Sequence, residues 1–164
     1  MGLEITVIDD SDYVGYAAAM VREDEIYMVD VPSMVANVVA RLRIYSRVCT
    51  PVVNYNKISR LNILDHGDKD GIEIGNDVIT VGTLPHYEAS LRQLRGRFEQ
   101  GGFVHVQHCE AGQNRSLLIA LARTFGANVY AGTGYHNPIY RINFFGDYVR
   151  AEPNGHFTYG VGRP

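Results

Sequence analysis

Short runs of β-type residues alternate with helix-type segments along most of this chain, and this alternation constrains its fold more than any other feature. Runs rich in β-branched and apolar residues lie at 4–8, 25–30, 58–64, 103–107 and 128–131. Apolar residues recur at helical spacing after Pro32, from about 85 to 99, and from 117 to 125. The pattern predicts an α/β domain with a three-layer fold, in which helices cover both faces of a mostly parallel sheet.

The end of the chain departs from this alternation. Pro153-Asn154-Gly155 separates two apolar stretches within residues 140–162, which predicts a C-terminal β-hairpin that turns at these three residues. No repeat, low-complexity stretch or linker interrupts the sequence. Residues 1–164 are therefore expected to form a single domain, of a size that can bury one core.

Composition and charge exclude several function classes. Fifteen Lys and Arg residues against eighteen Asp and Glu residues give a formal charge of −3, so no basic field would attract nucleic acid or anionic lipid. The sequence has no apolar run long enough to span a membrane and no secretory signal pattern at its start. Two cysteines, Cys49 and Cys109, form neither a Cys-x-x-Cys pair nor a disulfide framework. These features favour a cytoplasmic protein that uses no metal and no cofactor.

Three polar junctions marked by glycine follow predicted strands, at 65–67, 108–110 and 132–134. The carboxyl ends of parallel strands share one edge of a sheet, where ligands bind, so the three junctions are expected to meet. Cys109 stands just before a predicted helix, a position that favours a reactive thiolate, and His66 ends another strand. A thiolate attacks carbonyl carbon and an imidazole transfers protons near neutral pH. The amides of Gly67 and Cys109 would form an oxyanion hole.

The residues around these two side chains resemble the caspase-like cysteine peptidases, which include caspases, gingipains and related bacterial domains. In that family a His-Gly pair ends one strand and a Cys ends the next, each after a hydrophobic block. The corresponding segments here are Leu61-Asn62-Ile63-Leu64-Asp65-His66-Gly67 and Phe103-Val104-His105-Val106-Gln107-His108-Cys109. The resemblance covers residues 56–134 and implies a caspase-like (clan CD) fold. It also implies an endopeptidase with a His66–Cys109 dyad that forms a thioester acyl-enzyme.

The resemblance implies a protein or peptide substrate as well. Asp68 and Glu110 stand at the expected mouth of the site, where carboxylates would favour a basic residue before the scissile bond. Gly132 and Thr133, from the third junction, are expected to line the substrate site. The caspase signature Gln-Ala-Cys is replaced here by Gln107-His108-Cys109, which indicates a bacterial relative rather than a caspase proper.

Two other functions stay open. Residues 108–116 also spell His-Cys-x5-Arg-Ser, the phosphate-binding loop of protein tyrosine and dual-specificity phosphatases. In that scheme Cys109 would attack phosphorus, Arg115 would bind phosphate oxygens, and Asp77 stands at about the distance of the general acid. The strand and hairpin predicted after the following helix favour the peptidase. The third function is a caspase-like binding module without catalysis.

Overall fold

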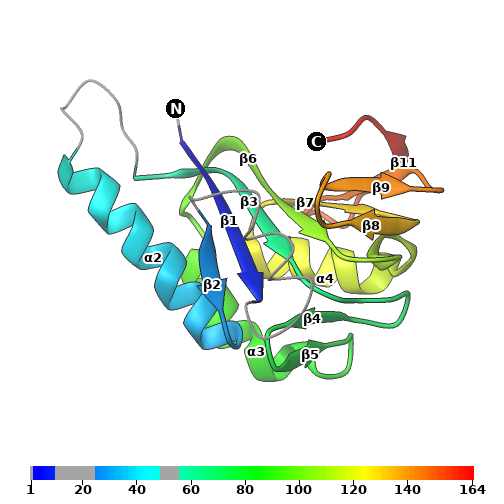
Figure 1. Cartoon of the computed structure of the whole chain (residues 1–164), viewed down its shortest axis with the longest axis horizontal. Coiled ribbons are helices and arrows are strands. Elements are labelled where there is room, and N and C mark those ends of the chain that lie inside the picture. The colour runs from blue at the N-terminus through cyan, green and yellow to red at the C-terminus, as the bar shows by residue number, and fades with distance from the viewer. Residues whose placement is uncertain (1, 10–24, 49–55) are drawn as a thin grey trace.

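A seven-stranded sheet runs through the computed structural model, which describes residues 2–9, 25–48 and 56–164. Its strand order is β11-β10-β7-β6-β3-β1-β2 (Figure 1). The strands are β1 (Leu3–Asp9), β2 (Ile26–Met28), β3 (Ile58–Leu64), β6 (Phe98–Gln107), β7 (Asn128–Gly132), β10 (Tyr148–Ala151) and β11 (Phe157–Val161). All pairs from β2 to β7 are parallel, whereas β10 pairs antiparallel with both β7 and β11. The predicted α/β class, mostly parallel sheet and C-terminal hairpin are therefore confirmed. Cys49 lies outside the described residues.

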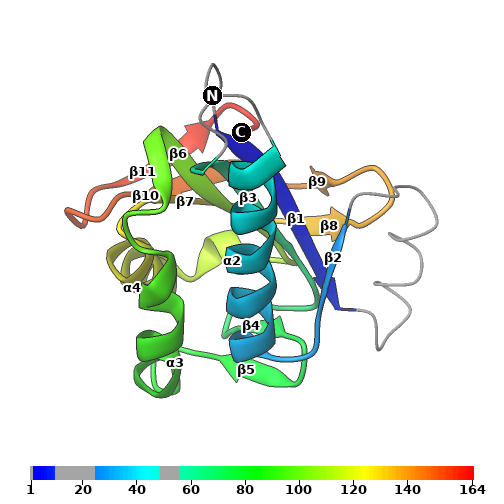
Figure 2. The same cartoon turned by 90° about the vertical axis from the view of Figure 1, so that its left-hand side faces the viewer.

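Three α-helices pack together on one side of this sheet. They are α2 (Val31–Val48), α3 (Leu84–Leu91) and α4 (Arg115–Phe125), and α3 contacts both of the others (Figure 2). The core lies between them and the sheet, where alternate strand residues such as Leu61, Ile63 and Val104 point inward. The arrangement is compatible with a three-layer α/β fold. Helices were expected on both faces, but within residues 2–9, 25–48 and 56–164 the α-helices cover only this one.

The opposite face of the sheet is polar and buried. Thr6, Asn62, His105 and Gln107 alternate with the core residues of β1, β3 and β6, and each is at most 8% exposed. The hairpin of β8 (Tyr135–Asn137) and β9 (Ile142–Phe144) lies on this side (Figure 2). Between its strands, Arg141 donates from Nη1 to Thr6 Oγ1 at 3.2 Å. Hydrogen bonds therefore contribute to this layer, together with a small apolar cluster of the buried Ile8 and Leu64.

The second predicted helix is shorter than its apolar spacing suggests. After α3 a 3-10 turn, η1 (Arg92–Leu94), is followed by Gly96 with a φ of 76°, and β6 begins at Phe98. Phe98 packs edge-on against Phe125 of α4, with ring centroids 6.4 Å apart. The prediction of helical structure from about 85 to 99 is wrong at its end, because β6 begins at Phe98 and also contains Gly101 and Gly102. Those glycines lie inside β6, where Gly101 has a φ of 81°.

A small antiparallel sheet of β4 (Ile72–Ile74) and β5 (Asp77–Ile79) follows β3. Its turn packs against the start of α2, because the Asn76 amide donates to the Val29 carbonyl at 2.7 Å. A Cβ at Gly75 would overlap the same Val29 carbonyl group, so only glycine fits. The small sheet therefore fixes the chain segment that leaves β3.

Candidate active site

Strands β3 and β6 bring the two predicted catalytic residues to one edge of the sheet. The strands are parallel neighbours, and Leu64 lies opposite Gln107 at their carboxyl ends. His66 and Cys109 each lie two residues beyond this pair. Adjacent strands are about 4.8 Å apart, so the two segments leave the sheet side by side.

The loop after β3 packs directly on the residue before Cys109. A Cβ at Gly67 would lie 3.0 Å from both the His108 Cβ and the Gly71 carbonyl oxygen, so the close approach depends on glycine. The Asn114 side chain makes a second link, because its Nδ2 donates to the Asp70 carbonyl at 3.2 Å. The first two of the three predicted junctions therefore meet.

The third junction joins them through the end of β7. The Glu110 amide donates to the Gly134 carbonyl at 2.8 Å, and Gln113 Nε2 donates to the Thr133 carbonyl at 2.8 Å. Thr133 Oγ1 accepts from the Asp147 amide at 2.9 Å, which ties the junction to the C-terminal hairpin. The structure thus places Thr133 against the cysteine loop, as it does Gly132.

The loop that carries Cys109 does not continue straight into a helix. Glu110 is in the left-handed region with a φ of 54°, and a 3-10 turn, η2 (Ala111–Gln113), follows it. The α-helix begins only at Arg115, with Asn114 as N-cap accepting from the Leu117 amide at 3.0 Å. The prediction that Cys109 stands just before a helix is wrong, because the backbone at Glu110 is not helical.

The sulfur of Cys109 contacts the β8–β9 hairpin. The His136 amide lies 3.4 Å from Sγ in donor geometry, and the His136 carbonyl is 3.9 Å away. The His136 ring is mostly buried, and this burial, with the charge of Arg163, lowers its pKa to about 4. Sequence reasoning missed His136, since a backbone contact leaves no mark in the residue type.

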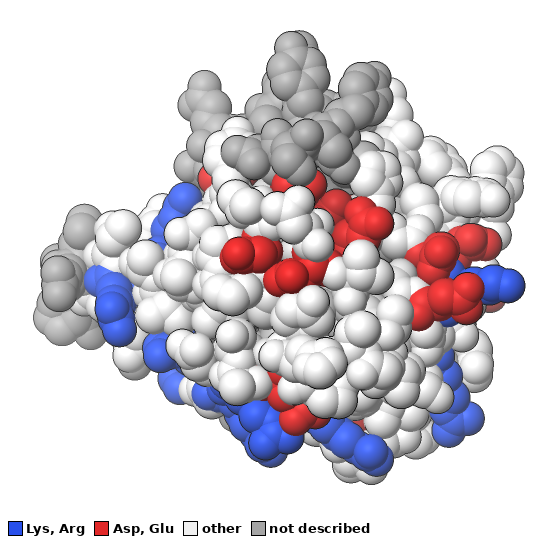
Figure 3. All heavy atoms as spheres, turned by 90° about the horizontal axis from the view of Figure 1, so that it is seen from below, with Lys and Arg blue, Asp and Glu red and all other residues white. Residues whose placement is uncertain are grey.

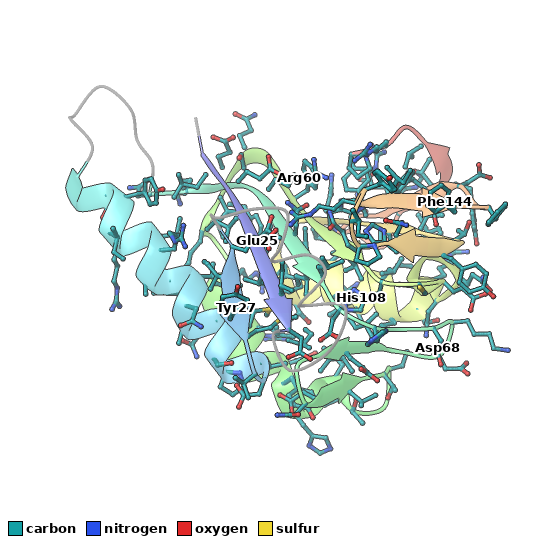
Figure 4. All side chains as sticks on the ribbon, viewed as in Figure 1. Glu25, Tyr27, Arg60, Asp68, His108 and Phe144 are labelled. Carbon is teal, nitrogen blue, oxygen red and sulfur yellow. The ribbon has the colours of Figure 1, made fainter. Side chains whose placement is uncertain are left out.

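His108 and Asp65 support the loops from below. His108 is 1% exposed, and its Nε2 lies 2.7 Å from the Glu73 carbonyl (Figure 4). Burial lowers the pKa of His108 to about 3, so its ring is neutral and donates this hydrogen bond. Asp65 is also buried and accepts from the amides of His66 at 2.7 Å and Gly75 at 2.8 Å. Both side chains therefore hold backbone in place.

A cavity of about 260 Å³ opens beside His66. Asp68, Asp70 and Glu73 give it an acidic lining, whereas Glu110 is not part of its wall. Figure 3 shows acidic side chains gathered on the face seen from below Figure 1, the end at which β4 and β5 lie. The predicted acidic mouth thus involves Asp68, but its other acidic residues are Asp70, from the loop after β3, and Glu73, from β4.

The two residues predicted for a phosphatase have other partners. The Arg115 side chain is exposed, and its guanidinium lies over the Phe157 ring of β11 at 5.6 Å. Asp77 Oδ2 accepts from the Val31 amide at 2.9 Å, at the start of α2. Within residues 2–9, 25–48 and 56–164, no three His, Cys, Asp or Glu side chains gather as metal ligands. No helix in that part of the chain is long and apolar enough to cross a membrane.

A family model described as "Domain of unknown function (DUF4347)" matches residues 32–136. The matched region runs from α2 to β8 and contains His66, Cys109 and the three junctions. No curated protein matches the chain.

Proposed function

Since the chain belongs to the DUF4347 family, whose function is unknown, we propose a function from its own residues, that of a caspase-like cysteine peptidase. One observation carries the proposal. Parallel β3 and β6 are neighbours with Leu64 opposite Gln107, so that His66 and Cys109 follow their strands at the same level. The resemblance of residues 56–134 to caspase-like peptidases predicts this arrangement, a His-Gly after one strand and a Cys after the next.

The proposed reaction proceeds by acyl transfer. The Cys109 thiolate attacks the scissile carbonyl carbon, and His66 gives a proton to the leaving amine as the C–N bond breaks. Water then attacks the thioester while His66 takes one of its protons. The C–S bond breaks, the carboxylic acid leaves, and the thiolate is restored.

We assign the oxyanion hole to two backbone amides, those of Gly67 and Cys109. Gly67 and Ile72 form an antiparallel bridge flanked by the hydrogen bonds Asp68 N to Gly71 O, 3.0 Å, and Glu73 N to His66 O, 2.9 Å. This pattern leaves the Gly67 amide outside the bonds of the bridge. The Glu110 amide is already donated to Gly134, so the Cys109 amide is the second proposed donor.

The acidic cavity beside His66 bears on the substrate. Asp68, Asp70 and Glu73 line it, and a peptide with a basic side chain near the scissile bond would complement them. The His136 amide contacts Cys109 Sγ. A peptide bound at Cys109 therefore lies beside this contact or displaces it. The phosphatase alternative has no comparable support, because Arg115 and Asp77 are engaged by β11 and α2.

Digestion of a peptide library with the purified chain tests the proposal. Wild-type protein and Arg115→Ala should cleave, preferentially beside Lys or Arg, whereas Cys109→Ala and His66→Ala should not. Loss of a proton-transfer group lowers rates by roughly 10²–10⁴-fold. Cleavage that survives His66→Ala, or phosphate-ester hydrolysis that is lost with Arg115→Ala, contradicts the peptidase. Peptide binding without cleavage in all four proteins identifies a binding module instead.

A further inference from the structure

The buried polar face of the sheet contains a second cavity. It measures about 90 Å³ and is lined by Glu4, Arg60, Asn62, Gln107, Arg141 and Arg163. Half of these residues are arginines, and Cys109 is not among them. Figure 4 labels Arg60 on this side of the sheet. The cavity is therefore a cationic site separate from the proposed peptidase centre.

Hydrogen bonds fix the orientation of Asn62 at the cavity wall. Its Nδ2 donates to Glu4 Oε1 at 3.0 Å and to Thr6 Oγ1 at 3.1 Å. Its Oδ1 therefore accepts from Arg60 Nε at 2.7 Å and from Gln107 Nε2 at 3.1 Å. The contact with the Glu4 carboxylate excludes the flipped amide, because two acceptors would then face each other.

The orientation of Gln107 follows from that of Asn62. Gln107 Nε2 lies 3.1 Å from His105 Nδ1, which also lies 2.9 Å from Arg60 Nη2. Burial, and then the charge of Arg60, keeps the pKa of His105 well below its usual value, so its ring is neutral. Nδ1 is the acceptor of this neutral ring, because the Arg60 guanidinium that faces it can only donate. Gln107 Oε1 therefore faces away from both. It is buried, with no hydrogen-bond partner among the described residues, on a side chain 1% exposed.

The charges around the cavity favour an anion. Three arginines and one carboxylate, that of Glu4, are among the residues that line it. Arg60 lies 3.8 Å from Glu4 Oε1, and Arg141 forms an ion pair with Glu25. Arg163 is exposed, and its Nη2 donates to the Arg141 carbonyl at 3.1 Å. The described lining thus contains more basic than acidic side chains, but Gln107 Oε1 is an acceptor and needs a donor. A matching ligand therefore carries a negative charge and an O–H group together.

We propose that this cavity binds inorganic phosphate. At neutral pH phosphate keeps a P–O–H group for Gln107 Oε1 and offers charged oxygens to the arginines. Sulfate has no proton to donate. A phosphate monoester loses its last proton with a pKa of about 6, so above that pH it also lacks the donor. The cavity has room for several water molecules, enough for the five heavy atoms of phosphate.

Isothermal titration calorimetry of the full chain tests the site. The ligands are inorganic phosphate, methyl phosphate and sulfate, each titrated at pH 8. Phosphate should bind with 1:1 stoichiometry, and both other anions should bind at least about tenfold more weakly. Arg163→Ala should weaken phosphate binding by about tenfold or more, because a charge-assisted hydrogen bond is lost. Arg43→Ala removes the same charge from an exposed position on α2, outside the cavity, and should bind phosphate as wild type does.

Three results would overturn the site. The first is that wild-type protein does not bind phosphate. The second is that sulfate or methyl phosphate binds as tightly as phosphate. The third is that Arg163→Ala binds phosphate with the same affinity as wild-type protein. Far-ultraviolet circular dichroism establishes that the variants are folded. Arg163→Gln provides the same test if the alanine variant is not. None of these measurements depends on peptidase activity, so the two proposals stand or fall separately.

Discussion

Gly112 is the residue at which the cysteine loop approaches the end of β7 most closely. A Cβ at this position would lie 2.7 Å from both the backbone carbon and the carbonyl oxygen of Gly132. Backbone atoms cannot move aside as a side chain does, so Gly112→Ala has to push the loop off β7. We expect the free energy of unfolding to fall by about 1–3 kcal/mol, measured by chemical denaturation.

Gly82→Ala is the matched control for this substitution. The nearest atom to a Cβ at Gly82 is Thr80 Oγ1, at 3.7 Å, which is an ordinary contact. Gly82→Ala should therefore unfold at nearly the same denaturant concentration as wild-type protein. Equal midpoints for the two variants would contradict the close packing at Gly112.

The positions of His66 and Cys109 after two strands were predictable from the sequence, whereas contacts made through the main chain were not. His66 and Cys109 stand at strand ends with the residue types that acyl transfer requires, and the strand pairing brings their segments together. The role of Asp65 is different, because both of its oxygens bind backbone amides. His136 contacts Cys109 through its main-chain amide, so the residue type at this position did not predict the contact.

Asn114, the N-cap of helix α4, links the cysteine loop to the loop after β3. Asn114 accepts from the Leu117 amide through Oδ1 at 3.0 Å, and donates through Nδ2 to the Asp70 carbonyl at 3.2 Å. Asn114→Ala removes both bonds, and we expect a loss of about 1 kcal/mol in the free energy of unfolding from the cap alone. Chemical denaturation measures the change.

Asn114→Asp separates the two roles. Aspartate keeps the cap acceptor but has no N–H for Asp70, so stability should return close to the wild-type value. Peptidase activity should stay reduced in both variants, because the loop after β3 has lost its link to the cysteine loop. If Asn114→Asp is as unstable as Asn114→Ala, the cap is not what stabilises this helix.

The elements with strong local signals were predicted well. Helix α4 ends at Gly126, which has a φ of 66°, and β7 begins two residues later, as the sequence indicates. The apolar spacing around Phe98 suggested a longer second helix, because a buried strand residue can occupy a helical position by chance. The β8–β9 hairpin was not predicted. Its strands have three residues each, too few for a periodic pattern.

Two buried histidines, His105 and His108, and the partly buried His136 make the whole molecule sensitive to acid. Burial lowers the pKa of His108 to about 3, that of His136 to about 4, and that of His105 well below its usual value. The unfolded chain titrates these groups near 6.5, so below that pH it binds more protons than the folded chain. Stability should therefore fall as the pH falls from about 6.5 towards 4, by up to about 1.4 kcal/mol per pH unit for each histidine.

His108→Gln tests this dependence. Glutamine can still donate to the Glu73 carbonyl but does not titrate. Between pH 6.5 and pH 5 the variant should lose about 2 kcal/mol less stability than wild-type protein. Guanidinium denaturation at both pH values measures the difference. His86 is exposed on α3, and His86→Gln should lose as much as wild type does. Identical losses in all three proteins would contradict a neutral, buried His108.

The alternation of strand-type and helix-type segments predicted the overall architecture. It did not predict the polar face of the sheet. Parallel strands covered by α2, α3 and α4 were predictable because their apolar residues repeat at fixed intervals. The polar layer of Thr6, Asn62 and Gln107 is built from residues far apart in the chain. No local pattern reports such long-range hydrogen bonds.

The proposed peptidase is tested most directly by the mass of the intact protein after a short reaction with a peptide ester and an acid quench. Wild-type protein should gain a mass equal to the acyl part of the ester, carried on Cys109, and Cys109→Ser should not. With p-nitrophenyl phosphate in place of the ester, no adduct should form. A phosphoryl adduct on Cys109, or an acyl adduct that persists in Cys109→Ser, would contradict a peptidase in which Cys109 is the nucleophile.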